Sequence, residues 1–235
     1  MKLIIIILIA IAGAAVASPL PDYPFVYVEG SARKDLQPDK ATITFSIVTY
    51  DAVAEVAFKS QGEVADRFLT FIEKTGLKRD AATAEAIEKS EVRKEENNQE
   101  MAILGYSMKR KVNIELDALS NFAEIMNFLY SQPQTAEINV IFSRKDEAEV
   151  LQSLVAEACQ DAQKTGNRLA NGFGKKLKTV KAISERHFPE MGDSFGLPGN
   201  FDSIGYGAGF SHRDFRTVPA TIPFYKRVFA IIEIE

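Results

Sequence analysis

A stretch of alternating residues over 103–116 constrains the fold of this chain most. Its apolar positions share one face of an expected strand, and Ser107, Lys109 and Glu115 share the other. The apolar face consists of Leu104, Tyr106, Met108, Val112, Ile114 and Leu116, and Arg110 interrupts it. Such a strand belongs to a sheet with one face in water and one face covered. The chain must therefore supply apolar elements that cover this sheet.

Two long amphipathic helices are predicted as that cover, over residues 52–74 and 146–171. Gly76 follows the first, and Gly172 and Gly174 end the second, as glycine commonly does after a helix. A shorter helix is predicted over 119–130, with Asp117 as its cap. The expected apolar positions are Val53, Val56, Ala57, Val64, Ala65, Phe68, Leu69 and Ile72 in the first helix, and Val150, Leu151, Leu154, Val155, Ala158, Ala162, Thr165, Leu169 and Ala170 in the second.

The remaining patterns predict further strands and an α+β fold. The expected strands are 25–30, 42–50, 84–94 (the first arm of a hairpin with its turn at 95–99), 136–142, 176–187 and 222–234. The last is apolar on both sides, which is typical of the middle of a sheet. We expect antiparallel sheets covered by two long helices and one shorter helix. A helix followed by two strands occurs in 52–116 and again in 146–234, so an internal duplication is a hypothesis.

The N-terminus has the pattern of an export signal. Lys2 precedes an uncharged apolar run, and Ala15-Val16-Ala17 matches the small-x-small pattern that signal peptidase requires. A retained anchor would need roughly 20 apolar residues, more than the run over 3–17 provides. The sequence therefore predicts cleavage after Ala17, and a mature protein of residues 18–235 that is periplasmic or otherwise exported, including association with an outer membrane.

Charge and cysteine content exclude two classes of protein. The net charge is −4, and Lys109-Arg110-Lys111 and Lys175-Lys176 are short basic groups that we expect on solvated faces. Nucleic-acid binding depends on larger basic surfaces, so no nucleic-acid partner is expected. The single Cys159 cannot form an internal disulfide. Stability must come from buried apolar surface.

The sequence predicts no catalytic residue, cofactor or metal site. A hydrolytic triad would need His187 or His212 beside a serine or Cys159, with a carboxylate such as Glu185 or Asp214 to orient it, and no G-x-S-x-G motif is present. The two histidines are not at metal-ligand spacing, and the glycine clusters do not join a strand to a helix as a phosphate cradle does. Cys159 is expected to be a buried thiol in an alanine-rich helix. The sequence does not indicate an enzyme.

A long loop over residues 188–218 is the candidate interaction site. Its aromatic residues lie among glycines and prolines, and a loop of this length is usually functional or disordered. It is either a surface excursion or a contact with a second subunit or a membrane. The residues that we expect to make the contact are Phe195, Phe201, Tyr206, Phe210 and Phe215.

Short motifs in order along the chain resemble those of the SIMPL-domain family. They are Val28-Glu29-Gly30, Pro38-Asp39 before the strand at 41–48, Gly105-Tyr106-Ser107, Arg168-Leu169-Ala170, and then Gly174, Leu177 and Val180. The resemblance covers nearly all of residues 25–235. Turn chemistry explains Pro38-Asp39, and a bulge beside a packed tyrosine explains Gly105-Tyr106.

The resemblance implies a cellular location and a physiological role. Members similar to this chain are exported bacterial proteins of the oxidative-stress-defence or periplasmic immunogenic antigen type, and some resemble subunits of ring or channel-like assemblies. No family-wide catalytic residues come with the resemblance. We expect a homo-oligomeric envelope protein that acts through interaction or stress protection. The alternative is a small ligand-binding or redox-protective periplasmic module, in which Cys159 or the methionines intercept oxidants.

Overall fold

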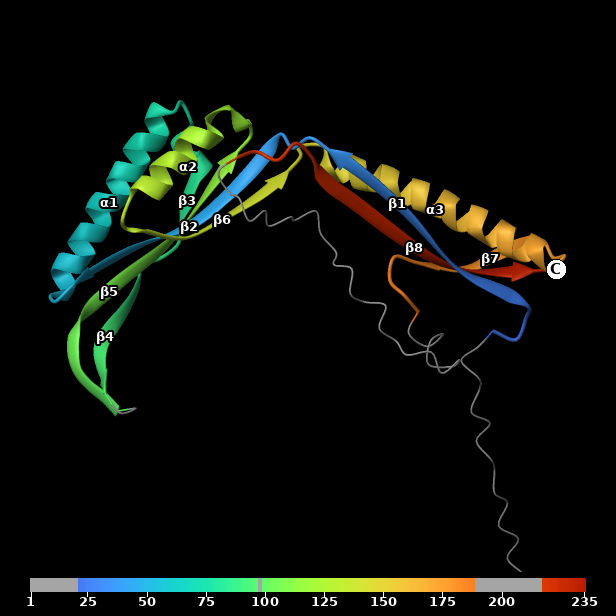
Figure 1. The fold of residues 1–235 in the computed structure, drawn as a ribbon, viewed down its shortest axis with the longest axis horizontal. Helices are drawn as coiled ribbons and strands as arrows, with labels where there is room; N and C mark the ends of the chain where they lie inside the picture. Colours follow the sequence, from blue (N-terminus) through green and yellow to red (C-terminus); the bar gives the residue numbers. More distant parts are fainter. Residues whose placement is uncertain (1–20, 97–98, 189–216) are drawn as a thin grey trace, which may run out of the picture. The chain divides into compact units, whose positions relative to one another are not determined.

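A computed structural model describes residues 21–96, 99–188 and 217–235, and shows an α+β protein with antiparallel sheets (Figure 1). Three α-helices lie in this part of the chain, two long and one shorter. The predicted fold class is confirmed. The expected signal segment and the five aromatic residues Phe195, Phe201, Tyr206, Phe210 and Phe215 lie outside the described residues.

The described chain forms two compact units that share three elements. Among the described residues, the larger unit contains 31–158 and 217–226. The smaller unit contains 21–30, 159–188 and 227–235. The divisions fall inside β1 (Phe25–Leu36), α3 (Glu147–Gly172) and β8 (Ile222–Ile234). Both units are therefore built from stretches that are distant in sequence.

The larger unit is built on a five-stranded sheet. Four strands follow the order β3 (Ala82–Ala84), β5 (Gln99–Leu116), β2 (Lys40–Asp51) and β6 (Thr135–Ser143), and β4 (Glu88–Glu96) also pairs with β5. The pairings of β2 with β5 and β6, and of β5 with β3 and β4, are antiparallel. The expected hairpin arm over 84–94 is wrong in one respect, because the chain leaves the sheet after β3 and returns as β4.

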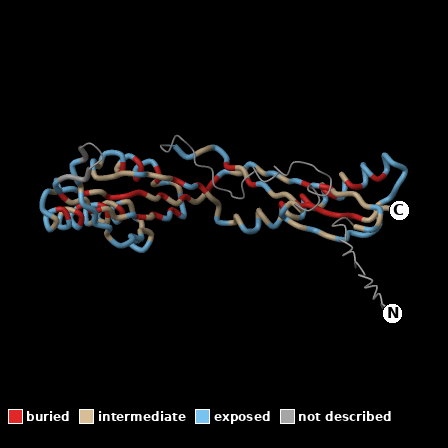
Figure 2. Tube along the Cα trace, turned by 90° about the horizontal axis from the view of Figure 1, so that it is seen from below, coloured by how far each residue is buried: buried red, intermediate tan, exposed pale blue. Residues whose placement is uncertain are grey.

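Two helices, α1 (Ala54–Lys74) and α2 (Phe122–Ser131), cover one face of this sheet (Figure 1). Their aromatic rings join the layers: Phe68 lies 5.0 Å from Phe45 of β2, and Phe71 stacks on Phe128 at 3.8 Å between centroids. Met108, Val112, Ile114 and Leu116 of β5 are buried in the same layered interior. Ala41, Ile43, Phe45 and Ile47 are buried at every second position of β2, as the alternating pattern predicted. Figure 2 shows the trace coloured by burial.

The start of α1 departs from the predicted apolar face. Val53 and Val56 are 55% and 49% exposed, whereas Gln61 is fully buried. The helix begins at Ala54, so Val53 is its N-cap rather than part of the buried stripe. Gln61 is accepted in the core because its amide donates to the Ile47 carbonyl at 3.3 Å and Thr49 lies 3.2 Å from its oxygen.

The cap predicted for the shorter helix is wrong. A 3₁₀ turn over Leu119–Asn121 precedes α2, and neither Asp117 nor another side chain caps the helix. Asn121, at the N-cap position, instead donates from its amide to the Thr75 carbonyl at 2.7 Å. This bond ties the start of α2 to the end of α1.

The smaller unit contains a three-stranded sheet in the order β1, β8, β7 (Leu177–Ser184). The central place of β8 confirms the prediction from its two-sided apolar pattern. The C-terminal part of α3 packs closely on this sheet, because a Cβ atom at Gly166 would lie 3.2 Å from Leu177 and 3.4 Å from Ile232. Small residues along the helix therefore set the separation between helix and sheet.

Both long helices end at glycines as predicted. Gly76 and Gly174 have φ of +78° and +68°, in the left-handed region that glycine adopts without steric cost. After α3 the Lys175 amide donates to the Ala170 carbonyl at 2.8 Å, the long bond of a Schellman motif. Leu169, expected on the apolar face of α3, is 40% exposed.

Candidate functional site

The structure describes only some of the residues that we considered as candidates for catalysis or oxidant reaction. Cys159 is a free, half-buried thiol rather than the buried thiol that we expected. His187 packs its ring on Tyr27 at 5.8 Å and on Phe229 at 5.6 Å. Asp214, its proposed triad partner, lies outside the described residues. The His187 ring thus belongs to an aromatic cluster of the smaller unit, where burial raises the pKa of the Tyr27 hydroxyl.

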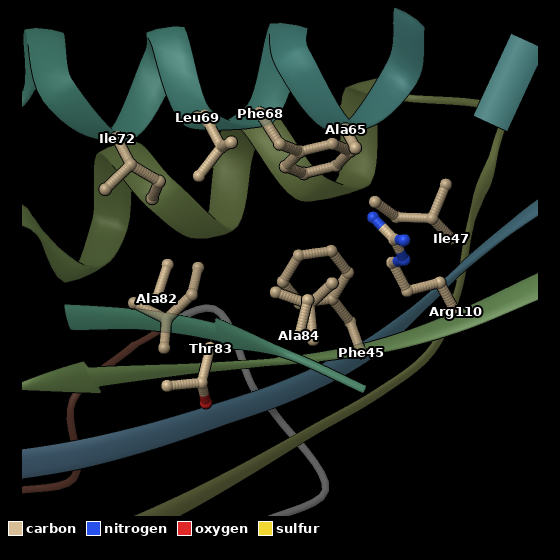
Figure 3. A pocket seen from close by; sticks show the side chains of 12 residues that line it. Phe45, Ile47, Ala65, Phe68, Leu69, Ile72, Ala82, Thr83, Ala84 and Arg110 are labelled. Atoms are coloured by element: carbon tan, nitrogen blue, oxygen red, sulfur yellow. The ribbon is translucent and has the colours of Figure 1, made fainter. Parts of the chain in front are cut away.

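A cavity in the larger unit is the most developed candidate site. It lies between α1 and the sheet and has a volume of about 70 Å³ (Figure 3). By the measure in which one water needs roughly 10–15 Å³, this is room for several waters or a small group. The lining residues are Phe45 and Ile47 of β2, Ala65, Phe68, Leu69 and Ile72 of α1, Ala82, Thr83 and Ala84 of β3, and Arg110, Val112 and Ile114 of β5.

Small residues on facing elements leave this space open. Ala82 and Ala84 share one face of β3 because successive strand side chains alternate, and Ala65 lies on the helix opposite them (Figure 3). Larger side chains at these positions would fill the cavity to the usual density of a protein interior. Ala84 is exposed and Ala65 is half-buried, so both lie at its margin.

Arg110 places a cation in this apolar cavity. It stands opposite Ile47 in the β2–β5 register and its side chain extends toward α1 (Figure 3). Its Nε atom is buried and has no hydrogen-bond partner in the described part of the chain. A buried donor without a partner costs about 1–3 kcal/mol. The site thus contains an unsatisfied donor on a guanidinium group.

We expected Lys109, Arg110 and Lys111 on a solvated face, and for Arg110 this expectation is wrong. Lys109 and Lys111 lie on the opposite face of β5 and form ion pairs with Glu137 at 2.7 Å and Glu85 at 3.7 Å. Arg110 does not share that solvated face, because strand side chains alternate.

The sheet edge is also interrupted beside Arg110. β3 pairs with β5 as far as Ala84 opposite Val112, and β4 pairs from Glu88 opposite Lys109. Between these pairings one backbone bond is made, from the Glu85 amide to the Lys111 carbonyl at 2.9 Å. The cavity cation therefore stands at the junction of two short edge strands.

A second polar cluster lies around Glu137. This residue has φ of +54°, which is uncommon for a side chain other than glycine, where the β2–β6 register shifts. Its carboxylate accepts hydrogen bonds from Lys109 and from the Ser46 hydroxyl, each at 2.8 Å. These bonds, first that of Lys109 and then that of Ser46, hold the pKa of Glu137 below its ordinary value of 4.5. The cluster stabilises an irregular strand and holds Ser46 as a donor.

In the part of the chain that the structure describes, no group of three or more His, Cys, Asp or Glu side chains is placed to hold a metal ion. Among the described helices, none is both long and apolar enough to cross a bilayer.

A surface depression beside Asp80 is bordered by Glu115 and Asp117, whose carboxylates lie 3.3 and 4.0 Å from the Lys40 ammonium.

Comparison with known proteins identifies the family. Residues 26–203 match the model of the SIMPL family, described as a protein of unknown function (DUF541). The chain belongs to the SIMPL family, which confirms the resemblance of its motifs.

Individual relatives agree with this assignment. The uncharacterized protein YggE of Escherichia coli (strain K12) is 28% identical over 198 residues, which cover 78% of this chain and 76% of that protein. The uncharacterized protein YggE of Edwardsiella ictaluri (strain 93-146) is 26% identical over 196 residues, which cover 78% of this chain and 79% of the relative. These similarities establish the family without assigning a biochemical role.

Sequence reasoning missed the cavity and the buried Gln61. For the cavity, the available signal was that Arg110 interrupts an apolar strand face. The small pair Ala82 and Ala84 was a weaker one, because alanine is equally common at positions that pack tightly. Gln61 carried no signal, since its burial depends on partners that the fold brings from β2.

Proposed function

We propose that this chain is an exported SIMPL protein of the cell envelope that self-associates and acts by binding rather than by catalysis. The basic residue, apolar run and Ala15-Val16-Ala17 site at the N-terminus support export. The single observation that carries self-association is an exposed apolar surface in the larger unit.

We define this apolar surface as four large apolar side chains at or beside the junction of β2 and α1, namely Tyr50, Val53, Val56 and Leu104, which are 54%, 55%, 49% and 51% exposed. Tyr50 is the penultimate residue of β2, Val53 is the N-cap of α1, Val56 lies in the first turn of α1, and Leu104 belongs to β5. Large apolar side chains that gather on a surface mark protein–protein contacts more often than scattered ones do.

Two hydrogen bonds fix the Tyr50 side chain and the backbone at Val53. The Tyr50 hydroxyl donates to the Leu104 carbonyl at 3.0 Å, and the Val53 amide donates to the Asp51 carboxylate at 2.8 Å. Side chains fixed before association lose less entropy when a partner binds. A preformed surface of this kind suits a stable interface.

A second copy of the chain is the partner that we propose. In the described part of the larger unit, β6 lies at the end of the strand order and pairs with β2. Ile141 on β6 is 41% exposed. A sheet edge with exposed apolar side chains can add a strand from another chain, which gives a copy of this protein a further contact. The loop aromatics Phe195, Phe201, Tyr206, Phe210 and Phe215 are proposed to add to the same assembly or to contact the envelope.

Light scattering on residues 18–235 tests the proposal. We expect a discrete oligomer for the wild-type protein at micromolar concentration, and a smaller mass for the variant Val53→Asp/Val56→Asp, because a buried unpaired carboxylate opposes association. Ile183→Lys is the control, since Ile183 is 63% exposed but lies in the smaller unit. A monomeric wild-type protein would disprove self-association. Dissociation by Ile183→Lys alone would move the interface to β7.

A redox-protective module is the second candidate function. The observation in its favour is the half-buried free thiol of Cys159, which leaves part of the residue accessible to oxidants. If Cys159 protects cells, the Cys159→Ser variant should fail to restore the oxidant resistance of a deletion strain. Full restoration by Cys159→Ser would remove the thiol from the mechanism.

A further inference from the structure

We propose that the cavity between α1 and β3–β5 binds an amphiphilic monocarboxylate, with Arg110 holding its head group and the apolar walls holding its hydrocarbon chain. This site is separate from the self-association proposed above and does not depend on it. It assigns the larger unit a ligand class that neither the fold nor the family supplies.

The head group is assigned from the chemistry of Arg110. The guanidinium offers parallel N–H groups that match the two oxygens of a carboxylate, and its buried Nε has no partner among the described residues. A carboxylate that accepts from Nε and a terminal nitrogen would satisfy this donor. The unoccupied hydrogen-bonding capacity therefore points to a planar anion.

The charge of the ligand follows from the lining. Of the 12 described lining residues, Arg110 is the one that carries a charge, and Thr83 is exposed on the alternate face of β3. One cation among apolar lining residues balances one negative charge, whereas a second charge would have no partner among the residues that line the cavity. A carboxylate fits this balance better than a phosphate dianion.

The hydrocarbon chain of the ligand is inferred from the apolar residues that line the cavity. Phe45, Phe68 and Ile72 are buried on the two sides of the cavity, and the half-buried Leu69 stands toward its margin (Figure 3). Removal of a hydrocarbon chain from water against such walls is favourable by about 0.8 kcal/mol for each CH₂ group. The volume of about 70 Å³ limits the enclosed part to a short segment of the chain. We therefore use octanoate as the probe.

The edge of the sheet offers a way in. Ala84 is exposed where β3 ends, and the β5 edge passes to β4 only at Glu88. Arg110 stands at this break between the two edge strands. A ligand entering between Ala65 of α1 and Ala84 of β3 would meet the guanidinium without separating a strand pair.

Calorimetric titration of residues 18–235 with octanoate tests the site. We expect saturable binding with one ligand per chain. Arg110→Met keeps an unbranched apolar side chain but removes the cation, and should weaken octanoate binding about tenfold or more, the equivalent of a charged hydrogen bond. Lys111→Met is the matched control, because it removes a neighbouring cation from the opposite face of β5 and should leave the affinity unchanged.

Further binding measurements distinguish the contribution of the Arg110 contact with the head group from that of the apolar cavity. Octanol should bind the wild-type protein and Arg110→Met alike, and octyl phosphate should bind the wild-type protein more weakly than octanoate. Ala65→Leu retains Arg110 and fills the space, so it should abolish octanoate binding even if Arg110→Met fails to fold. Equal octanoate affinity of Arg110→Met and Lys111→Met would overturn the role of Arg110, and wild-type affinity in Ala65→Leu would place the ligand elsewhere. None of these readouts depends on the oligomer mass, so the two proposals can fail independently.

Discussion

The ring of Tyr50 lies directly against Gly105, across the β2–β5 pair. A Cβ atom at Gly105 would stand 2.7 Å from the Tyr50 hydroxyl oxygen and 2.6 Å from the Asp51 carbonyl oxygen. Real Cβ atoms do not approach other atoms this closely, so a larger residue would displace backbone as well as the ring. Gly105 also adjoins the register shift of β4 against β5. The predicted bulge is confirmed, but the tyrosine packed on the glycine is Tyr50 rather than Tyr106.

This contact predicts that Gly105→Ala destabilises the protein. We expect a loss of about 1–3 kcal/mol in the free energy of unfolding, the usual result of overpacking, measured by urea denaturation. Gly62→Ala is the control, because a Cβ there has no atom within 4 Å and alanine favours the helix by up to about 1 kcal/mol. A Gly105→Ala protein as stable as the wild type would show that the Tyr50 contact is not maintained in solution.

The Glu137 cluster predicts a pH dependence of stability. The pKa of Glu137 is lowered by Lys109 and Ser46, so the folded state binds a proton less readily than the unfolded state. Its contribution is therefore present above pH 4.5 and is lost as the pH falls through the lower folded-state pKa. Glu137→Gln should destabilise the protein at pH 7 and have a smaller effect near pH 3, as measured by urea denaturation at each pH.

The backbone strain at Glu137 is common to both forms, so it cannot produce this pH dependence. Lys109→Met serves as the matched control, since it removes the larger cause of the pKa shift and should show the same trend. The double variant should show little further pH dependence. Equal destabilisation by Glu137→Gln at both pH values would mean that the charge of Glu137 contributes nothing.

The N-terminal pattern predicts a mature protein that begins at Ser18. Intact-mass measurement on protein exported by a bacterial host should find residues 18–235. Ala17→Tyr should prevent cleavage, because the peptidase requires a small residue there, whereas Val16→Leu should be processed normally. A wild-type mass that includes Lys2 would show that the segment is retained.

The aromatic loop predicts a contribution to assembly. Deletion of residues 190–214 should lower the mass measured by light scattering, because it removes Phe195, Phe201, Tyr206 and Phe210. The matched control replaces the same stretch with a Gly/Ser linker of equal length, and we expect it to match the deletion. An unchanged oligomer in both variants would exclude the loop from the interface.

Periodicity predicted the layout because it reports which face of an element is buried. Two-sided burial placed β8 in the centre of its sheet, and alternation placed Met108 and Ile114 of β5 in the core. The predictions from sequence are wrong at positions where a contact with another element, or the end of an element, overrides the local pattern. Val53 fits the helical period but precedes the helix, and Asn121 bonds to Thr75 instead of capping its own helix.

The candidate cavity could not be predicted in the same way. Its space arises from small residues on β3 and α1 that are brought together across the sheet, such as Ala82 and Ala65. Such pairs are distant in sequence, and alanine by itself does not distinguish a void from close packing. Arg110 signalled an irregularity, but its significance depends on the missing carboxylate partner, which requires the fold to be seen.

The three elements shared by the two units have a consequence for biogenesis. Synthesis proceeds from the N-terminus, yet β8, which ends at Ile234, supplies the central strand of the smaller sheet and, through Ile222 and Phe224, part of the larger core. Neither unit is complete until β8 has been synthesised. The stretches that precede β8 in the chain therefore cannot complete the smaller sheet or the larger core before β8 is available to pair and pack.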